Sequence, residues 1–97
     1  MKLSFHPDAE SEFDLAISYY EECEPGLGYD FSLEVLTGIQ AIDEYPRGWP
    51  VIENDVRRCL VNRFPFGIVY SVEENDEILI LSIMHLRQNP LHWQKRK

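Results

Sequence analysis

Hydrophobic residues recur at helical spacing in the first half of this chain and at strand spacing in the second half. Between residues 7 and 23, apolar side chains return every three or four positions, which predicts an amphipathic helix. Proline is tolerated at the first helical position, where its missing N–H needs no partner, and Pro7 stands there. Asp8 and Glu10 then place negative charge near the positive end of the helix dipole. These features predict that the helix begins at Pro7.

A second helical period follows after a short break. Residues 24–28 contain two glycines and a proline, which should end the first helix and turn the chain. Apolar residues then recur every three or four positions from Phe31 to Ile42, and Pro46 ends the pattern. Because the connection is short, we expect the two helices to form an antiparallel hairpin.

The second half of the chain contains three short runs rich in β-branched and aromatic residues. They cover residues 56–63, 66–72 and 78–84, with turn-forming residues between them, which predicts an antiparallel meander. A shorter alternation at residues 3–5 predicts one more strand, whereas residues 46–55 show no period and predict a loop. We therefore expect an α+β domain with the order β-α-α-β-β-β. A helical hairpin should pack on one face of a small, mostly antiparallel, four-stranded sheet.

The last predicted strand is apolar on both of its faces. From Ile78 to Met84 only Ser82 interrupts the apolar run, which is typical of a central strand that is covered on both sides. The predicted helices can cover only one side. We therefore expect a groove of exposed apolar surface, which an amphipathic helix of a partner protein could fill.

Length and composition favour a single soluble domain. The 97 residues fit one domain, residues 1–97, and no apolar run reaches the roughly 18 residues of a membrane helix. The first residues lack the apolar core of a signal peptide, so we expect a cytoplasmic protein without membrane contact. Cys23 and Cys59 lie far apart with no zinc-binding spacing around them. We expect both to be reduced thiols packed as small hydrophobes, and no metal or organic cofactor.

The net charge of −8 is unevenly distributed along the chain. Residues 1–46 hold eleven acids and one base, whereas residues 47–97 hold six acids and eight bases. Two stretches, residues 56–72 and 85–97, contain basic residues and no acid. The acidic charge therefore belongs to the predicted helical hairpin, and we expect a locally basic site formed by the later strands and the C-terminal tail.

The end of the last strand carries side chains that can hydrogen-bond and hold charge. Residues 85–90 read His-Leu-Arg-Gln-Asn-Pro directly after the apolar run. His85 is a natural general acid or base, because its unperturbed pKa lies near neutral pH. Arg87 follows an apolar strand with no acid nearby in sequence. We place the candidate site at this point of the chain.

Several segments, taken in order, resemble the RelE/ParE superfamily of toxin proteins from bacterial toxin–antitoxin modules, also known as plasmid stabilisation system proteins. The resemblance covers essentially the whole chain and rests on the order of elements together with local segments. These segments are Tyr19-Tyr20-Glu21-Glu22, Pro46, Arg57-Arg58, Arg63-Phe64-Pro65-Phe66-Gly67-Ile68-Val69-Tyr70, His85-Leu86-Arg87-Gln88-Asn89-Pro90 and Trp93.

The resemblance implies a small growth-inhibiting protein that a cognate antitoxin neutralises by presenting a helix or an extended arm. It also implies a homodimer or a toxin–antitoxin hetero-oligomer. RelE-like members enter the ribosome and cleave mRNA, whereas ParE-like members act on DNA gyrase and cleave nothing themselves. The resemblance therefore leaves two kinds of target, and it leaves open whether the chain is an enzyme.

Metal-free RNA cleavage requires an acid, a base and fixed cations around the phosphorus. If the chain is a nuclease, the resemblance and the chemistry together assign catalysis to His85, Arg87, Arg63 and Arg58. Tyr70 would then hydrogen-bond or stack on a base. The expected target-binding set, whichever target applies, is Arg57, Arg58, Arg63, Tyr70, His85, Arg87 and Trp93.

Two departures from the nuclease pattern favour the ParE-like branch. RelE-like nucleases tend to carry an arginine in the third strand where this chain has Gly67, and they are strongly basic, whereas this chain is acidic. We therefore expect a toxin that inhibits growth by binding an essential target, with DNA gyrase favoured. The alternatives are a ribosome-dependent mRNA endoribonuclease and a decayed member that only binds its antitoxin.

Overall fold

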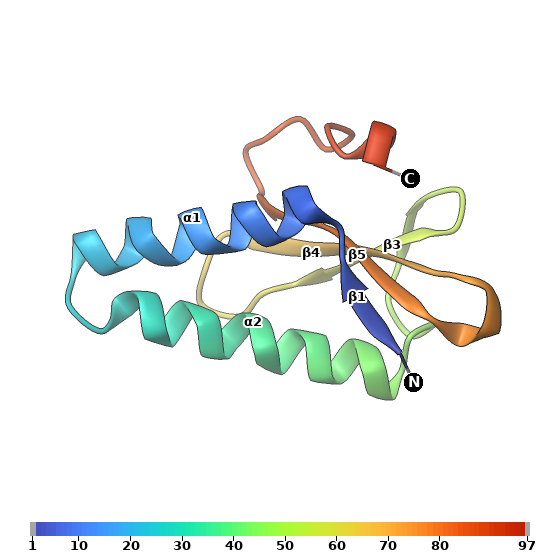
Figure 1. Cartoon of the computed structure of the whole chain (residues 1–97), viewed down its shortest axis with the longest axis horizontal. Coiled ribbons are helices and arrows are strands. Elements are labelled where there is room, and N and C mark those ends of the chain that lie inside the picture. Colours follow the sequence, from blue (N-terminus) through green and yellow to red (C-terminus); the bar gives the residue numbers. More distant parts are fainter. Residues whose placement is uncertain (1, 97) are drawn as a thin grey trace.

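Two helices and five strands make up the computed structural model, which describes residues 2–96. Figure 1 shows the helical hairpin lying in front of the sheet, with the C-terminal segment folded back beside it. The elements are β1 (Leu3–Phe5), α1 (Pro7–Cys23), α2 (Leu27–Glu44), β2 (Val51–Glu53), β3 (Val56–Leu60), β4 (Phe66–Val72) and β5 (Ile78–His85). Short 3-10 turns cover Glu74–Asp76 and Gln94–Arg96.

The strands form one mixed sheet in the order β1-β5-β4-β3-β2. β1 runs parallel to β5, and all other neighbours are antiparallel. The predicted α+β class, the element order and the largely antiparallel sheet are confirmed. The sheet has one more strand than predicted, because β2 lies within the expected loop 46–55 and pairs with β3. A three-residue strand is too short to show a period in the sequence.

The predicted helical hairpin is also confirmed, with α1 starting at Pro7. The Nδ1 atom of His6 accepts a hydrogen bond from the N–H of Asp8 at 3.1 Å and so caps the helix. The turn into α2 uses Gly26 at φ 89°, a backbone conformation that costs glycine little. At Gly28 a Cβ atom would lie 2.5 Å from the carbonyl oxygen of Ile17. Glycine therefore lets the two helices approach closely at the turn.

The main core lies between the helices and the sheet. Phe31, Val35 and Ile42 of α2 are fully buried against strand residues that include Ile68 and Ile80. A register shift in the β4–β5 pair places Val69 opposite Ser82 but Tyr70 opposite Ile80, so Leu81 is an extra residue. The bulge allows Ile80 and Ile83, which strict alternation would place on opposite faces, to join the same core cluster.

The opposite face of the sheet is covered by the C-terminal tail, residues 86–96. Trp93 is 2% exposed and packs with Val56, Val69, Leu81 and Met84 in a second apolar cluster. The prediction that β5 is covered on both faces is thus correct, but the prediction of an exposed apolar groove on its second face is wrong. The chain supplies its own cover, because the tail is long enough to fold back across the strands.

The two cysteines lie in different environments, and neither forms a disulfide. Cys59 is buried in the main core, where burial raises the pKa of its thiol. Cys23 lies exposed at the end of α1, so its predicted packing as a small hydrophobe is wrong. Within residues 2–96, no helix is both long and apolar enough to cross a membrane.

Candidate functional site

The candidate site begins at the end of β5, where His85 is fixed by its neighbours. Its ring Nδ1 atom accepts a hydrogen bond from the backbone N–H of Arg87 at 3.0 Å. The backbone N–H of His85 donates to the side-chain oxygen of Gln88 at 2.9 Å. The ring meets Phe66 edge-on, with ring centres 5.2 Å apart. Because Nδ1 is an acceptor, a neutral His85 carries its proton on Nε2. That atom has no partner among the described residues.

In the described part of the chain, Arg58 and Arg87 form no ion pair with a carboxylate, and unlike Arg57 they make no side-chain hydrogen bond to a backbone carbonyl. Arg87 is exposed at the start of the tail. Arg58 is partly buried and reaches across β4, since a Cβ atom at Gly67 would lie only 2.9 Å from its Cδ atom. The same Cβ atom would lie 3.6 Å from Leu86. Arg58 therefore approaches the start of the tail, where His85 and Arg87 lie.

This placement explains why position 67 is a glycine. The aliphatic part of Arg58 occupies the space that a side chain at Gly67 would need. An arginine from the neighbouring strand thus covers the position at which the nuclease pattern has an arginine of its own. We define the free cationic patch as Arg58, His85 and Arg87.

Two other predicted arginines lie elsewhere and have partners. Arg57 donates to the carbonyl oxygens of Trp49 at 2.6 Å and Arg47 at 3.2 Å, so it tethers the loop before β2. Arg63 forms ion pairs with Glu34 at 3.4 Å and Asp30 at 3.8 Å on α2. The structure therefore does not gather the predicted catalytic residues His85, Arg87, Arg63 and Arg58 around one point.

Tyr70 and Trp93 lie in the interior of the protein. Tyr70 is fully buried, its hydroxyl donates to the carbonyl oxygen of Pro46 at 2.6 Å, and burial raises its pKa to about 12. The indole N–H of Trp93 donates to the carbonyl oxygen of Pro90 at 2.6 Å. Both side chains pack against the sheet in the interior, so they present almost no surface to a target.

Glu12 is a key residue that the sequence did not single out. Its carboxylate reaches from α1 to β5, where it accepts hydrogen bonds from the hydroxyl of Ser82 at 2.8 Å and the N–H of Ile83 at 3.2 Å. Arg96 donates to both carboxylate oxygens, at 2.8 and 3.1 Å, and the His92 ring lies 2.9 Å away. Glu12 therefore joins α1, β5 and the tail.

The position of Glu12 follows from the short length of β1. β1 pairs with β5 only as far as Ile80, so the backbone beyond it has no strand neighbour on that edge. The N–H of Ile83 bonds to Glu12, and the carbonyl oxygen of Leu81 accepts from Arg96 at 3.0 Å. Burial alone would raise the pKa of Glu12, but hydrogen bonds from Arg96, His92 and Ser82 outweigh it and lower the pKa. No local pattern links residues so far apart in sequence.

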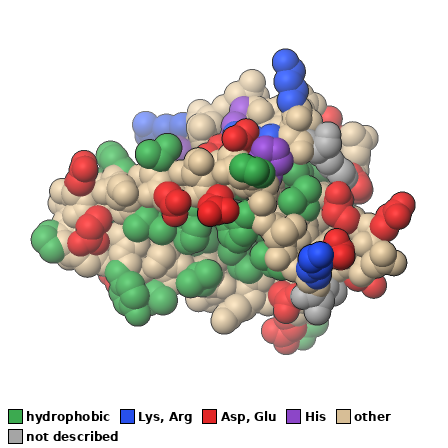
Figure 2. Space-filling view, in the orientation of Figure 1, with side chains coloured by type: hydrophobic (Ala, Val, Ile, Leu, Met, Phe, Trp, Pro, Cys, Tyr) green, Lys and Arg blue, Asp and Glu red, His purple; other side chains and the backbone are tan. Residues whose placement is uncertain are grey.

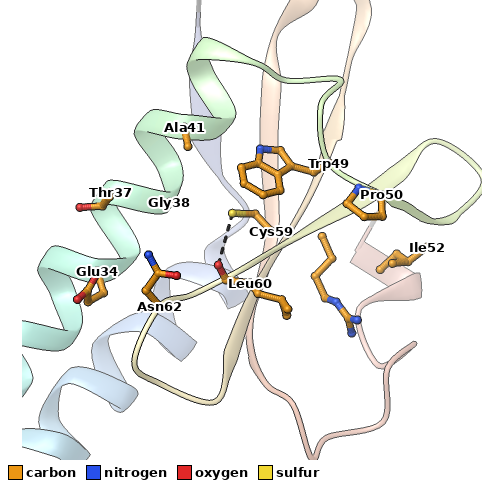
Figure 3. A pocket seen from close by; sticks show the side chains of 11 residues that line it. Glu34, Thr37, Gly38, Ala41, Trp49, Pro50, Ile52, Cys59, Leu60 and Asn62 are labelled. Carbon is orange, nitrogen blue, oxygen red and sulfur yellow. Dashed lines mark hydrogen bonds between the residues drawn. The ribbon is translucent and has the colours of Figure 1, made fainter.

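An apolar groove of about 420 Å³ lies between α2 and the outer edge of β3. Figure 3 shows Gly38 and Ala41 of α2 facing Cys59 across it, with the Trp49 ring at one end. Among residues 2–96, no cluster of three or more His, Cys, Asp or Glu side chains could hold a metal ion. The surface that lines the groove is mostly apolar, so the groove offers room for apolar side chains.

The outer face of the hairpin has a different character. Figure 2 shows acidic and apolar side chains over the hairpin and few cations on that side. Tyr19, Tyr29 and Leu36 are among its exposed apolar residues, at 63%, 66% and 46% exposure. The acidic hairpin and the free cationic patch are thus separate surfaces. Arg57, Arg63 and Arg96 belong to neither surface as free cations, because each is held by a partner within the chain.

A solved structure shares this fold. A chain of the chromosomal ParDE toxin–antitoxin system from P. aeruginosa superposes with a TM-score of 0.76 and 21% sequence identity, covering 88% of this chain and 95% of that chain. At that identity the likeness establishes the fold. A search of curated proteins gives no significant match.

The family follows from the sequence as a whole. The sequence model of the ParE toxin of the type II toxin–antitoxin system parDE matches residues 3–90, which is most of the chain. The chain therefore belongs to the ParE toxin family, within the RelE/ParE superfamily that its sequence resembles.

Proposed function

We propose that this toxin stops growth by binding DNA gyrase and that a cognate antitoxin neutralises it. Membership of the ParE family supports action by binding. The observation that carries the choice against RNA cleavage is the separation of the expected catalytic residues. Arg63 is paired with Glu34 and Asp30 on α2, whereas His85 and Arg87 lie at the end of β5.

The free cationic patch is the proposed target-binding surface. Arg87 is exposed and its guanidinium has no partner among the described residues, so it can bind an acidic group of the target without first breaking an ion pair. His85 precedes Arg87 by two residues, and the hydrogen bond that its Nδ1 atom accepts from the Arg87 backbone N–H holds the ring in place. Arg57, Arg63, Tyr70 and Trp93 support this surface from within or lie away from it.

A supercoiling assay with purified gyrase tests the proposal. The protein should inhibit supercoiling or trap cleavage complexes, and Arg87→Ala should weaken the effect about tenfold or more. Arg47→Ala is the matched control, because Arg47 pairs with Asp76 in a distant exposed loop. Unchanged gyrase activity at saturating protein would refute the gyrase target.

One observation keeps a second candidate function, mRNA cleavage on the ribosome. The Nε2 atom of His85 has no partner among the described residues, and the guanidinium of Arg87, two residues further along the chain, has none either. An imidazole and a guanidinium are groups that could transfer a proton and bind a phosphate. Primer extension on translated mRNA would then show cuts at codon positions that disappear in His85→Ala. Intact transcripts would exclude this function.

The antitoxin proposal has its own test. Co-expression with the small reading frame next to the toxin gene should yield a stable complex and restore growth. A toxin that purifies alone under these conditions would count against neutralisation by a partner. Expression without any growth defect would instead indicate a decayed member that retains only antitoxin binding.

A further inference from the structure

We propose that Leu60 and Leu86 form the apolar centre of the target-binding surface and receive a large apolar side chain from an acidic segment of the target protein. This inference rests on the proposed function and adds the chemistry of the segment that the free cationic patch binds. It follows from where the two leucines lie, which charges flank them and what the C-terminal tail leaves uncovered.

Leu60 lies on the face of the sheet that also carries Arg58. Side chains alternate along β3, so Cys59 points into the main core and Leu60 points to the opposite face (Figure 3). Leu60 pairs with Gly67 across the strands, and Gly67 pairs in turn with Met84, which belongs to the second apolar cluster. Leu60 therefore stands in the same row as a residue that the tail covers.

Leu86 approaches this row from the start of the tail. Its backbone N–H donates to the carbonyl oxygen of Pro65 at 2.9 Å, which holds the start of the tail against the residue before β4. A Cβ atom at Gly67 would lie 3.6 Å from the Cδ2 atom of Leu86 and 2.9 Å from the Cδ atom of Arg58. Leu86 and Arg58 therefore both border the space above the glycine, and Leu60 stands beside it.

The tail covers the rest of this face but leaves the two leucines in solvent. Trp93 is 2% exposed and packs with Met84, whereas Leu60 is 56% exposed and Leu86 is 43% exposed. A single exposed leucine is ordinary, but two that flank the same glycine gather apolar surface at one place. The sheet thus presents apolar surface directly beside the free cationic patch.

Cations without a carboxylate partner flank this apolar surface. Arg58 borders the same glycine, and Arg87 follows Leu86 directly in the chain. Neither arginine forms an ion pair within residues 2–96. Protein interfaces commonly combine an apolar centre, which supplies most of the binding energy, with a polar rim. The inferred segment therefore places an aliphatic or aromatic side chain on the leucines and carboxylates on the two arginines.

The surroundings favour a protein over a nucleic acid as the occupant. Proteins that hold single-stranded nucleic acid use exposed aromatic side chains, on which bases stack, together with a row of cations. The aromatic residues of this region, Phe66, Tyr70 and Trp93, are at most 9% exposed. Exposed leucines, rather than further cations, lie between Arg58 and Arg87. This arrangement fits a side chain of a protein target.

Inhibition of supercoiling by purified variants tests the role of each leucine. Leu60→Ser and Leu86→Ser should each raise the concentration needed to inhibit gyrase by about tenfold or more. Val51→Ser is the matched control and should change it less than about twofold, because Val51 is 49% exposed and pairs with Arg57 on the opposite face of the sheet. Each variant is first shown to keep the thermal unfolding transition of the parent chain.

A charged substitution separates an apolar contact from attraction to a polyanion. Leu86→Lys adds a cation next to the free cationic patch but removes apolar surface. Docking of an apolar side chain predicts that it weakens inhibition by about tenfold or more. If Leu86→Lys inhibits gyrase as well as the parent chain or better, the surface attracts a polyanion and the inference is overturned.

The remaining outcomes separate this inference from the proposed function. If the parent chain leaves gyrase unaffected, the proposed function fails, and the inference fails with it. If the parent chain inhibits gyrase and both serine variants inhibit it equally well, the gyrase target stands and the apolar centre is refuted. If the serine variants lose affinity for the co-expressed antitoxin but still inhibit gyrase, the leucines serve the antitoxin, and the inference is likewise overturned.

Discussion

At the scale of single residues, Glu12 does the most to complete the fold. β1 stops opposite Ile80, and the Glu12 carboxylate takes over hydrogen bonding at Ser82 and Ile83 on the same edge of β5. The same carboxylate binds Arg96, which fastens the tail. One side chain therefore replaces part of a missing strand and anchors the cover of the second apolar cluster.

Replacing Glu12 should cost stability. Glu12→Gln removes the charge that Arg96 and His92 face, and it leaves the largely buried guanidinium of Arg96 with only the more distant carboxylate of Asp8, at 3.7 Å. We expect the free energy of unfolding to fall by about 2–3 kcal/mol, as measured by urea denaturation. Glu10→Gln, at an exposed position of the same helix, should stay within about 0.5 kcal/mol. Equal stability of the two variants would show that the Glu12 cluster adds nothing to the fold.

The stability contributed by Glu12 should depend on pH in a defined direction. Because the folded state holds the pKa of Glu12 below its ordinary value of 4.5, this stability is present above about pH 4.5. It is lost as the pH falls through the lower folded-state pKa. The difference in unfolding free energy between the parent chain and Glu12→Gln should therefore shrink on acidification. A difference that is constant from pH 7 to pH 3 would contradict this assignment.

At the scale of elements, the C-terminal tail covers the face of the sheet that the helices leave uncovered. Figure 1 shows the C-terminal segment returning beside the strands rather than extending from them. Its buried apolar residue, Trp93, completes the cluster of Val69, Leu81 and Met84. The predicted exposed groove on this face does not exist, because the chain itself occupies it.

The importance of Trp93 can be measured directly. Trp93→Ala should lower the free energy of unfolding by about 3–5 kcal/mol, since it empties the centre of the second apolar cluster. Leu91→Ala changes a residue of the same tail that is 38% exposed and should cost less than about 1 kcal/mol. If both substitutions cost the same small amount in thermal or urea unfolding, the tail is not part of the cooperative domain.

The elements with a clear period were predictable from sequence, and those without one were not. Both helices and the strands from Val56 to Met84 follow repeating apolar positions. β2 has only three residues and is specified by pairing with β3. The position of the tail depends on Glu12, which pairs with Arg96 across most of the chain. Sequence patterns report local periodicity, and such distant contacts leave no trace in it.

The same distinction applies to the candidate site. The sequence predicted a site at the end of β5, because His85 and Arg87 follow an apolar strand with no acid nearby, and the structure places both residues there. It could not show that Arg63 turns to α2, where Glu34 and Asp30 hold it. Ion pairs between distant segments depend on the fold. For that reason, the basic patch expected from sequence is larger than the one observed.

At the scale of the whole molecule, charge is divided between two surfaces. The hairpin carries acidic and apolar side chains (Figure 2), while the free cationic patch lies on the sheet and the start of the tail, around the end of β5. An acidic hairpin repels nucleic acid and favours basic partners. A surface with so few free cations is better suited to binding a protein than to holding an RNA strand.

The most direct test of this account is plasmid topology in cells just after the toxin is induced, read together with the integrity of cellular transcripts. Inhibition of gyrase predicts that plasmids lose negative supercoiling while transcripts stay intact, and that Arg87→Ala weakens the effect while Arg47→Ala does not. Cuts at codon positions in mRNA, with supercoiling unchanged, would contradict the proposal that this toxin acts by binding gyrase.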